Sequence, residues 1–200
     1  GGEVGFLDDD AEWMVSCVTD TRVELRVANV KKFIVDANSR ISLSNNDSGA
    51  DNTVFGFLAG AALASGGDDN VLIGDYAGTA LQTGDYNIAI GSGALATADG
   101  SETNNIAIGY NSMNNANSNS IANNTVIGVV AGDAFGTAAV EQTVLIGNYS
   151  GSSINHADAS GTTCVGYYAG YAITSGQANV AVGYQALTAL TTGDNNATLG

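Results

Sequence analysis

One feature constrains the fold of this chain more than any other: a short motif that recurs every 17 to 19 residues. In each copy a large apolar residue is followed directly by glycine, and successive glycines are 18, 17, 18, 19, 19, 19, 17 and 17 residues apart. A fixed period of this size is typical of repeat proteins, in which each unit stacks on its neighbours. The nine glycines are Gly56, Gly74, Gly91, Gly109, Gly128, Gly147, Gly166, Gly183 and Gly200.

The residues before each glycine predict a short β-strand. The residue directly before it is always large and apolar, and the residue two places earlier is usually β-branched, as in Ile108 and Ile106. These two columns share one strand face because side chains alternate along a strand. The residue between them, such as Ala107, is also mostly apolar. A short strand that is apolar on both faces is expected to be buried on both faces.

The second half of each unit predicts tight turns. Ala or Ser stands three residues after the glycine in all eight complete units, and turn sequences such as Thr83-Gly84-Asp85 follow. The next unit opens with Asn in seven of nine copies, and stacked Asn side chains are expected to form a ladder from rung to rung. Proline is absent from the chain, as expected where every interior rung needs its N–H groups.

These patterns predict an all-β fold, a parallel β-solenoid of about nine coils over residues 51–200. At roughly 4.8 Å per rung, the rod would be about 40 Å long. Longer, more polar linkers at 111–124, 133–142 and 150–162 are expected to bulge outward. Each strand has two apolar faces, but a thin coil has only one core and can bury only one of them. We infer that an identical chain covers the other face, in a homotrimer.

Residues 1–50 form a different region. Glu12–Val18, Arg22–Val27 and Lys32–Leu43 alternate apolar and polar residues, which predicts three or four antiparallel strands leading into the rod. We interpret Trp13 as a core anchor. The predicted organisation is therefore an N-terminal strand region over 1–50 and a glycine- and asparagine-rich repeat region over 51–200.

The charge excludes several partners. The chain carries 5 Lys and Arg against 20 Asp and Glu, a net charge of −15, and residues 51–200 contain no Lys or Arg. Nothing in that region can displace phosphate counterions, so nucleic acid is not expected as a partner. An anionic membrane surface is disfavoured for the same reason. No apolar run approaches the roughly 20 residues of a spanning helix. The ends of the sequence suggest a piece of a longer polypeptide, from which a targeting signal would be missing.

The repeat resembles those of known fibrous proteins. Asn87-Ile-Ala-Ile-Gly91, with Ala94 after it, resembles the head repeat of trimeric autotransporter (YadA-like) adhesins, a left-handed parallel β-roll. The longer unit that begins at Asn179 is more similar to repeats of bacteriophage tail and head fibres. Glu12–Leu43 also resembles the strands upstream of such repeats. The resemblance covers residues 12–200 and implies a trimeric structural rod. The unit is longer than the adhesin repeat of about fourteen residues.

No residue pattern predicts catalysis. His156 is the only histidine, and although Ser and Asp residues lie near it, both are abundant in this chain by composition. We interpret Asp8–Asp10 as a solvated acidic turn, and Cys17 and Cys164 as small buried hydrophobic residues. Two cysteines are too few for a disulfide framework or a zinc knuckle. The sequence predicts no enzyme activity, no cofactor and no metal site.

Calcium is the main chemical alternative. Gly66–Asp75 resembles the nonapeptide of calcium-binding β-rolls, and 18 is twice nine. The half-period Gly and Asp do not recur, however, and the units around Asn105 and Asn179 lack acidic residues. Calcium needs six to eight oxygen ligands, so a regular acidic column would be required. We favour instead scattered cations that offset the electrostatic repulsion between the acidic chains of a trimer.

Three functions are therefore considered. The first is a structural fibre or spike segment of a bacteriophage virion, a trimeric rod that assembles with other fibre proteins and supports attachment to a cell-surface glycan or protein receptor. The second is the head of a bacterial trimeric surface adhesin. The third is a secreted calcium-binding β-roll. The sequence identifies neither the receptor nor the end of the rod that carries a binding tip.

Overall fold

The chain forms two compact units, residues 1–46 and 47–200. The structure, a computed structural model, describes residues 4–8, 11–18, 22–27, 30–35, 41–42, 51–118 and 121–200, with side chains from residue 51 onward. All named elements are β-strands except one 3-10 helix, η1 (Ala157–Ala159). Within these ranges no helix is long and apolar enough to span a bilayer.

The first unit is a five-stranded antiparallel meander in which each strand pairs with the next along the chain. The predicted antiparallel strands are confirmed, and β1 is an additional strand that the sequence analysis did not predict. Trp13 and Cys17 lie in β2, but their side chains and residues Asp9 and Asp10 lie outside the described residues. The strands are β1 (Val4–Asp8), β2 (Ala11–Val18), β3 (Arg22–Val27), β4 (Val30–Val35) and β5 (Ile41–Ser42).

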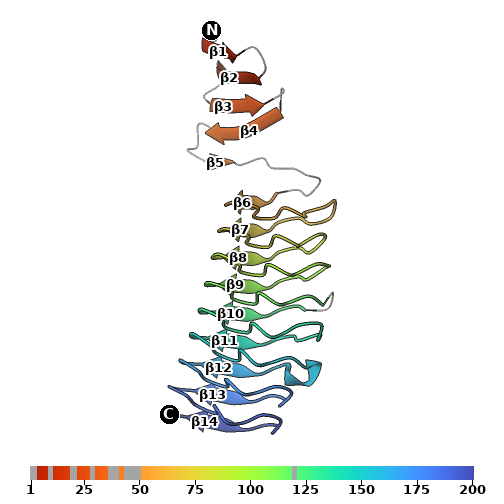
Figure 1. The fold of residues 1–200 in the computed structure, drawn as a ribbon, viewed down its shortest axis with the longest axis vertical. Coiled ribbons are helices and arrows are strands. Elements are labelled where there is room, and N and C mark those ends of the chain that lie inside the picture. Colours follow the sequence, from red (N-terminus) through yellow and green to blue (C-terminus); the bar gives the residue numbers. More distant parts are fainter. Residues whose placement is uncertain are drawn as a thin grey trace. The chain divides into compact units, whose positions relative to one another are not determined.

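The second unit confirms the predicted parallel β-solenoid. Nine three-residue strands form one parallel sheet in chain order, and each repeat contributes one strand (Figure 1). The register pairs equivalent residues of successive repeats, for example Ala89 with Ala107. The strands are β6 (Thr53–Phe55), β7 (Val71–Ile73), β8 (Ile88–Ile90), β9 (Ile106–Ile108), β10 (Thr125–Ile127), β11 (Val144–Ile146), β12 (Thr163–Val165), β13 (Val180–Val182) and β14 (Ala197–Leu199).

The glycine after each strand is required by close stacking. These glycines have φ values between 107° and 146°, which L side chains rarely adopt. A Cβ atom on any of the first eight would lie less than 3 Å from the backbone of the equivalent glycine one coil later. At Gly109, for instance, that distance to the carbonyl oxygen of Gly128 is 2.5 Å. The repeat period is therefore fixed by backbone contact between adjacent coils.

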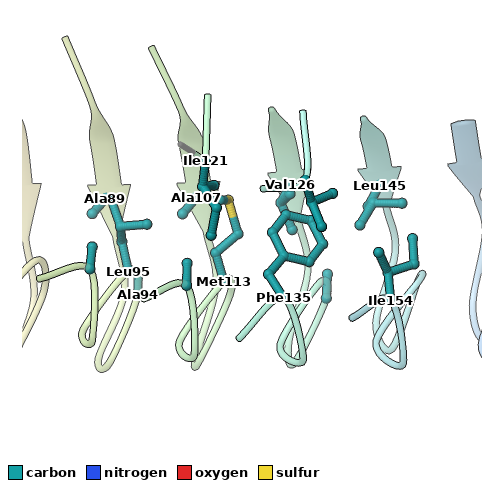
Figure 2. Close-up of a cluster of buried hydrophobic side chains, with 14 of the residues drawn as sticks. Ala89, Ala94, Leu95, Ala107, Met113, Ile121, Val126, Phe135, Leu145 and Ile154 are labelled. Atoms are coloured by element: carbon teal, nitrogen blue, oxygen red, sulfur yellow. The ribbon is translucent and has the colours of Figure 1, made fainter. Parts of the chain in front are cut away.

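A narrow hydrophobic core runs through the coils. It contains the middle residue of each strand from β7 to β13 and the Ala or Ser three residues after the glycine, such as Ala107 and Ala94 (Figure 2). Ser112 and Ser150 are buried in this column, and each hydroxyl donates to a carbonyl of the next strand, Val126 at 3.0 Å and Cys164 at 2.9 Å. The core is thus continuous from coil to coil.

Large core residues come from two alternative positions in the turn. In the coil after Gly91, the buried Leu95 is four residues past the glycine and the small Ala98 is seven past it. In the coil after Gly128 the order is reversed, with Gly132 at the fourth position and the buried Phe135 at the seventh (Figure 2). A Cβ on Gly132 would lie 3.3 Å from the ring of Phe135, so the coil accommodates one large side chain here.

The Asn residues that open the repeats form the predicted ladder, inside the coils. Nδ2 of Asn70 donates to Oδ1 of Asn52 at 3.1 Å, and the pattern continues through Asn87, Asn105 and Asn124. Each Oδ1 also accepts the backbone N–H of the next ladder residue, at 2.8 to 3.1 Å. These five side chains are buried. We call them the asparagine ladder.

The longer repeats differ from the others in two ways. Isolated parallel bridges join Thr103 to Ala122 and Ala122 to Glu141, so part of the added length is paired between coils. The polar linker before β12 forms η1, capped by His156, whose Nδ1 accepts the backbone N–H of Asp158 at 3.3 Å.

Candidate assembly surface

The strands leave one apolar face of the sheet on the surface. Middle residues such as Leu72 and Val126 are fully buried, whereas the residues on either side of them are partly or well exposed. Burial of both strand faces, which the sequence analysis expected, is therefore not achieved within one chain. In β8 and β9 the inner residue is alanine and the isoleucines on either side lie outside, whereas in β7 and β11 the inner residue is leucine.

The exposed face is continuous along the nine strands. Its residues repeat in register, so each side chain lies beside its equivalents on the neighbouring coils. The exposed fractions of Ile73 and Ile146 are 36% and 37%. We call this surface the apolar stripe: Thr53, Phe55, Val71, Ile73, Ile88, Ile90, Ile106, Ile108, Thr125, Ile127, Val144, Ile146, Thr163, Val165, Val180, Val182, Ala197 and Leu199.

The stripe is apolar along its whole length. It contains no charged residue, and its only polar side chains are the hydroxyls of Thr53, Thr125 and Thr163. Soluble monomers rarely expose a contiguous apolar surface of more than a few hundred Å², and larger ones mark interaction sites. A flat, repeating β-branched surface is suited to a partner with the same repeat.

A second exposed group consists of aromatic rings beyond the strands. The ring centroids of Tyr149 and Tyr168 are 4.8 Å apart, and Tyr168 also contacts Tyr167 and Tyr171 at 4.5 and 4.8 Å. Tyr167 stacks on Tyr184 with an interplanar angle of 9°. We call these five residues the tyrosine cluster. Desolvation by the surrounding rings, followed by the effects of the neighbouring phenols, raises the pKa of Tyr168.

The residues considered for chemistry do not assemble a site. The His156 Nδ1 atom lies 3.3 Å from the Asp158 carboxylate, and both side chains are more than half exposed. The hydroxyl of Ser160 donates to the Ala157 carbonyl at 2.6 Å instead of to the histidine. Cys164 is buried, as predicted, and its burial raises the thiol pKa to about 12.

The acidic residues also remain separate. Across residues 51–118 and 121–200, no three His, Cys, Asp or Glu side chains are grouped so that they could hold a metal ion. In the segment that resembles a calcium repeat, the backbone N–H of Asp68 donates to the carboxylate of Asp85, on the next coil, at 2.8 Å. The Asp85 side chain therefore makes a contact between coils.

Glu102 is a buried carboxyl group that the sequence analysis missed. Its side chain is fully buried, Oε2 accepts the backbone N–H of Gly100 at 3.1 Å, and Oε1 has no hydrogen-bond partner among the described residues. The same position holds the buried Ile121 and Val140 in the next two coils. All three residues stand seven positions before the glycine of their repeat, so an alignment of the repeats could have predicted that Glu102 is buried.

Comparisons with known proteins add no identity. No family model matches this chain, and no curated protein and no solved structure matches it either. The fold and the surface chemistry therefore carry the functional argument.

Proposed function

We propose that this chain is a rigid segment of a bacteriophage fibre or spike, a homotrimeric rod that supports attachment of the virion to a host receptor. The apolar stripe carries this proposal. It extends along the sheet without a charged residue, and its side chains are partly or well exposed. An identical chain would cover the stripe with the same 17 to 19-residue repeat.

The solenoid has the mechanical properties that such a rod requires. Adjacent coils are joined by the parallel sheet, by the asparagine ladder and by close glycine contacts, all of which repeat along one axis. In a solenoid, stability is approximately the sum of coil and coil–coil terms, so length can be extended without a new core. On this proposal the function is mechanical and multivalent, and no residue acts as a catalyst.

The acidic character supports an extracellular location on a virion. Residues 51–200 contain eleven acidic residues and no Lys or Arg, so copies of the rod repel one another outside their apolar contacts. This favours association through the stripe alone. The head of a bacterial surface adhesin would use the same rod, and the sequences that flank residues 1–200 would distinguish the two.

The experiment is a mass measurement in solution by sedimentation equilibrium. We expect three times the 20.0 kDa chain mass for the parent protein. Ile127→Asp places a charge on the stripe and is expected to give monomers, whereas Thr137→Asp, on an exposed turn residue, adds the same charge elsewhere and keeps the trimer. A parent chain that sediments as a folded monomer at all concentrations would overturn the assembly proposal.

A further inference from the structure

The tyrosine cluster is built on positions where the fold does not require an aromatic residue. Tyr149 and Tyr168 stand two residues after the repeat glycines Gly147 and Gly166, and their φ values are 60° and 56°. Residues as different as Leu58, Gly93 and Val130 hold this position in other coils, all with positive φ, so every coil has a left-handed residue here whatever its side chain. The backbone therefore does not select tyrosine, and what sets these residues apart is the contact between their rings.

The cluster is exposed and uncharged. The exposed fractions of Tyr167, Tyr171 and Tyr184 are 45%, 40% and 68%, so their rings add little to the core. The segments that carry the five rings, 147–151, 166–172 and 183–187, contain no charged residue. No Lys or Arg occurs anywhere in residues 51–200 to pair with an anionic ligand. The surface therefore combines apolar ring area with phenol hydroxyls in a field that disfavours anions.

We propose that the tyrosine cluster binds a neutral carbohydrate polymer. The inference rests on the proposed function as a fibre, and it specifies the class of receptor. A sugar ring presents apolar C–H groups bordered by hydroxyls, which match phenol rings with polar tips. The exposed amides of Asn148 and Gln185, beside the rings of the first and third coils, add donors and acceptors.

The arrangement favours a repeating polymer over a single sugar. The rings lie on three successive coils, and each coil advances the surface by roughly 4.8 Å. A polymer chain can contact several rings at once, and a trimer carries three copies of the cluster. Weak contacts then combine into useful avidity, without a deep pocket.

The test is a binding measurement with residues 1–200 on an array of purified neutral and anionic bacterial polysaccharides. We expect binding to at least one neutral polysaccharide. The triple variant Tyr167→Ser, Tyr171→Ser, Tyr184→Ser is expected to lose at least tenfold in affinity. Tyr86→Ser combined with Tyr110→Ser is the matched control, because both residues are exposed but do not belong to the cluster. Binding to no neutral polysaccharide, or to anionic ones only, would overturn the proposal.

A second measurement needs no variant. Nitration of the parent protein by tetranitromethane, followed by peptide mass analysis, reports the accessibility of each tyrosine. The bound polysaccharide should protect Tyr167, Tyr171 and Tyr184 at least threefold and leave Tyr86 and Tyr110 unchanged. Equal nitration with and without the polysaccharide would place binding elsewhere and overturn the proposal.

Sedimentation of the same samples separates this inference from the proposed assembly. A trimer without carbohydrate binding refutes the carbohydrate site alone, and a monomer that binds carbohydrate refutes the trimer alone. If the triple tyrosine variant is folded but monomeric, the cluster belongs to a subunit interface. That result would also overturn the carbohydrate proposal, with a protein surface as the true partner.

Discussion

Nδ2 of Asn105 donates a hydrogen bond of 3.2 Å to Oδ1 of Asn87, one coil earlier, and both side chains are buried. The same Oδ1 accepts the backbone N–H of Asn105 at 3.1 Å. Asn87 in turn donates to the carbonyl of Glu102 at 2.7 Å. One side chain thus satisfies buried polar groups on neighbouring coils.

Replacing Asn87 with alanine should destabilise the solenoid. The change leaves the Asn105 N–H and the Glu102 carbonyl without their present partner, whereas Oδ1 of Asn70 keeps the backbone N–H of residue 87. Each buried unsatisfied group costs about 1 kcal/mol or more, so we expect a loss of about 2 kcal/mol in the free energy of unfolding, measured by urea denaturation. Asn155→Ala, on an exposed residue, should change it by less than about 0.5 kcal/mol. Equal effects of the two substitutions would contradict the role of the ladder.

Replacing Gly109 with alanine should prevent the coils from stacking. The new Cβ would lie 2.5 Å from the Gly128 carbonyl oxygen, with φ at 134°, so the backbone of both coils must shift. We expect loss of the folded state, or a reduction of more than about 3 kcal/mol, followed by circular dichroism during thermal unfolding. Gly161→Ala is the control: φ is 77°, but no atom lies within 4 Å of the new Cβ, so only about 1–2 kcal/mol is expected. A normal melting curve for the Gly109 variant would contradict the stacking argument.

The solenoid could be predicted from the sequence because its periodicity is set by backbone contacts that only glycine permits. The choice of inner strand face could not, since Ala107 and Ile108 are both apolar and strand alternation does not say which one faces inward. The sequence also did not predict that the large core residue stands at the fourth position after the glycine in some coils, as Leu95 does, and at the seventh in others, as Phe135 does. It depends on the volume of the coil interior, which pairwise alignment of repeats does not reveal.

The tyrosine cluster was missed for a different reason. Its members stand one, two and five residues after the repeat glycine, at positions whose residue types vary from coil to coil, so an alignment of the repeats gives no common pattern there. Only the stacking of Tyr149 on Tyr168, and of Tyr167 on Tyr184, shows that they form one group. Gly66–Asp75 was not predicted to bind calcium because its acidic residues do not recur in a regular column.

Glu102→Gln should stabilise the protein at pH 7. Burial raises the pKa of the Glu102 carboxyl above its ordinary value of 4.5, and the charge of Asp99 raises it further, against the opposing effect of backbone N–H groups. The folded state therefore retains the proton more readily than the unfolded state. The contribution of Glu102 to the free energy of unfolding is therefore favourable at pH 4, and it is lost as the pH rises from about 4.5 through the folded-state pKa.

Thermal unfolding of the parent and variant between pH 4 and 8 checks this prediction. Glutamine removes the buried charge, so we expect a gain of about 1 kcal/mol at pH 7 that shrinks toward zero near pH 4. Glu141→Gln, at a partly exposed position two coils further on, removes the same charge and controls for the general repulsion of an acidic chain. A gain that is independent of pH, or equal for both variants, would be inconsistent with a buried carboxyl whose pKa is raised.

The Cys164 thiol should react only when the solenoid opens. Burial raises its pKa to about 12, so the thiolate, which is the reactive species, is only about one part in ten thousand at pH 8. In a Cys17→Ser variant, where Cys164 is the single cysteine, we expect labelling by iodoacetamide to be negligible in buffer. It should rise with urea in parallel with the loss of circular dichroism, because β12 and the core around Gly170 must separate before the thiol is exposed. Rapid labelling of the folded protein would show instead that this coil opens locally, far below the free energy of global unfolding.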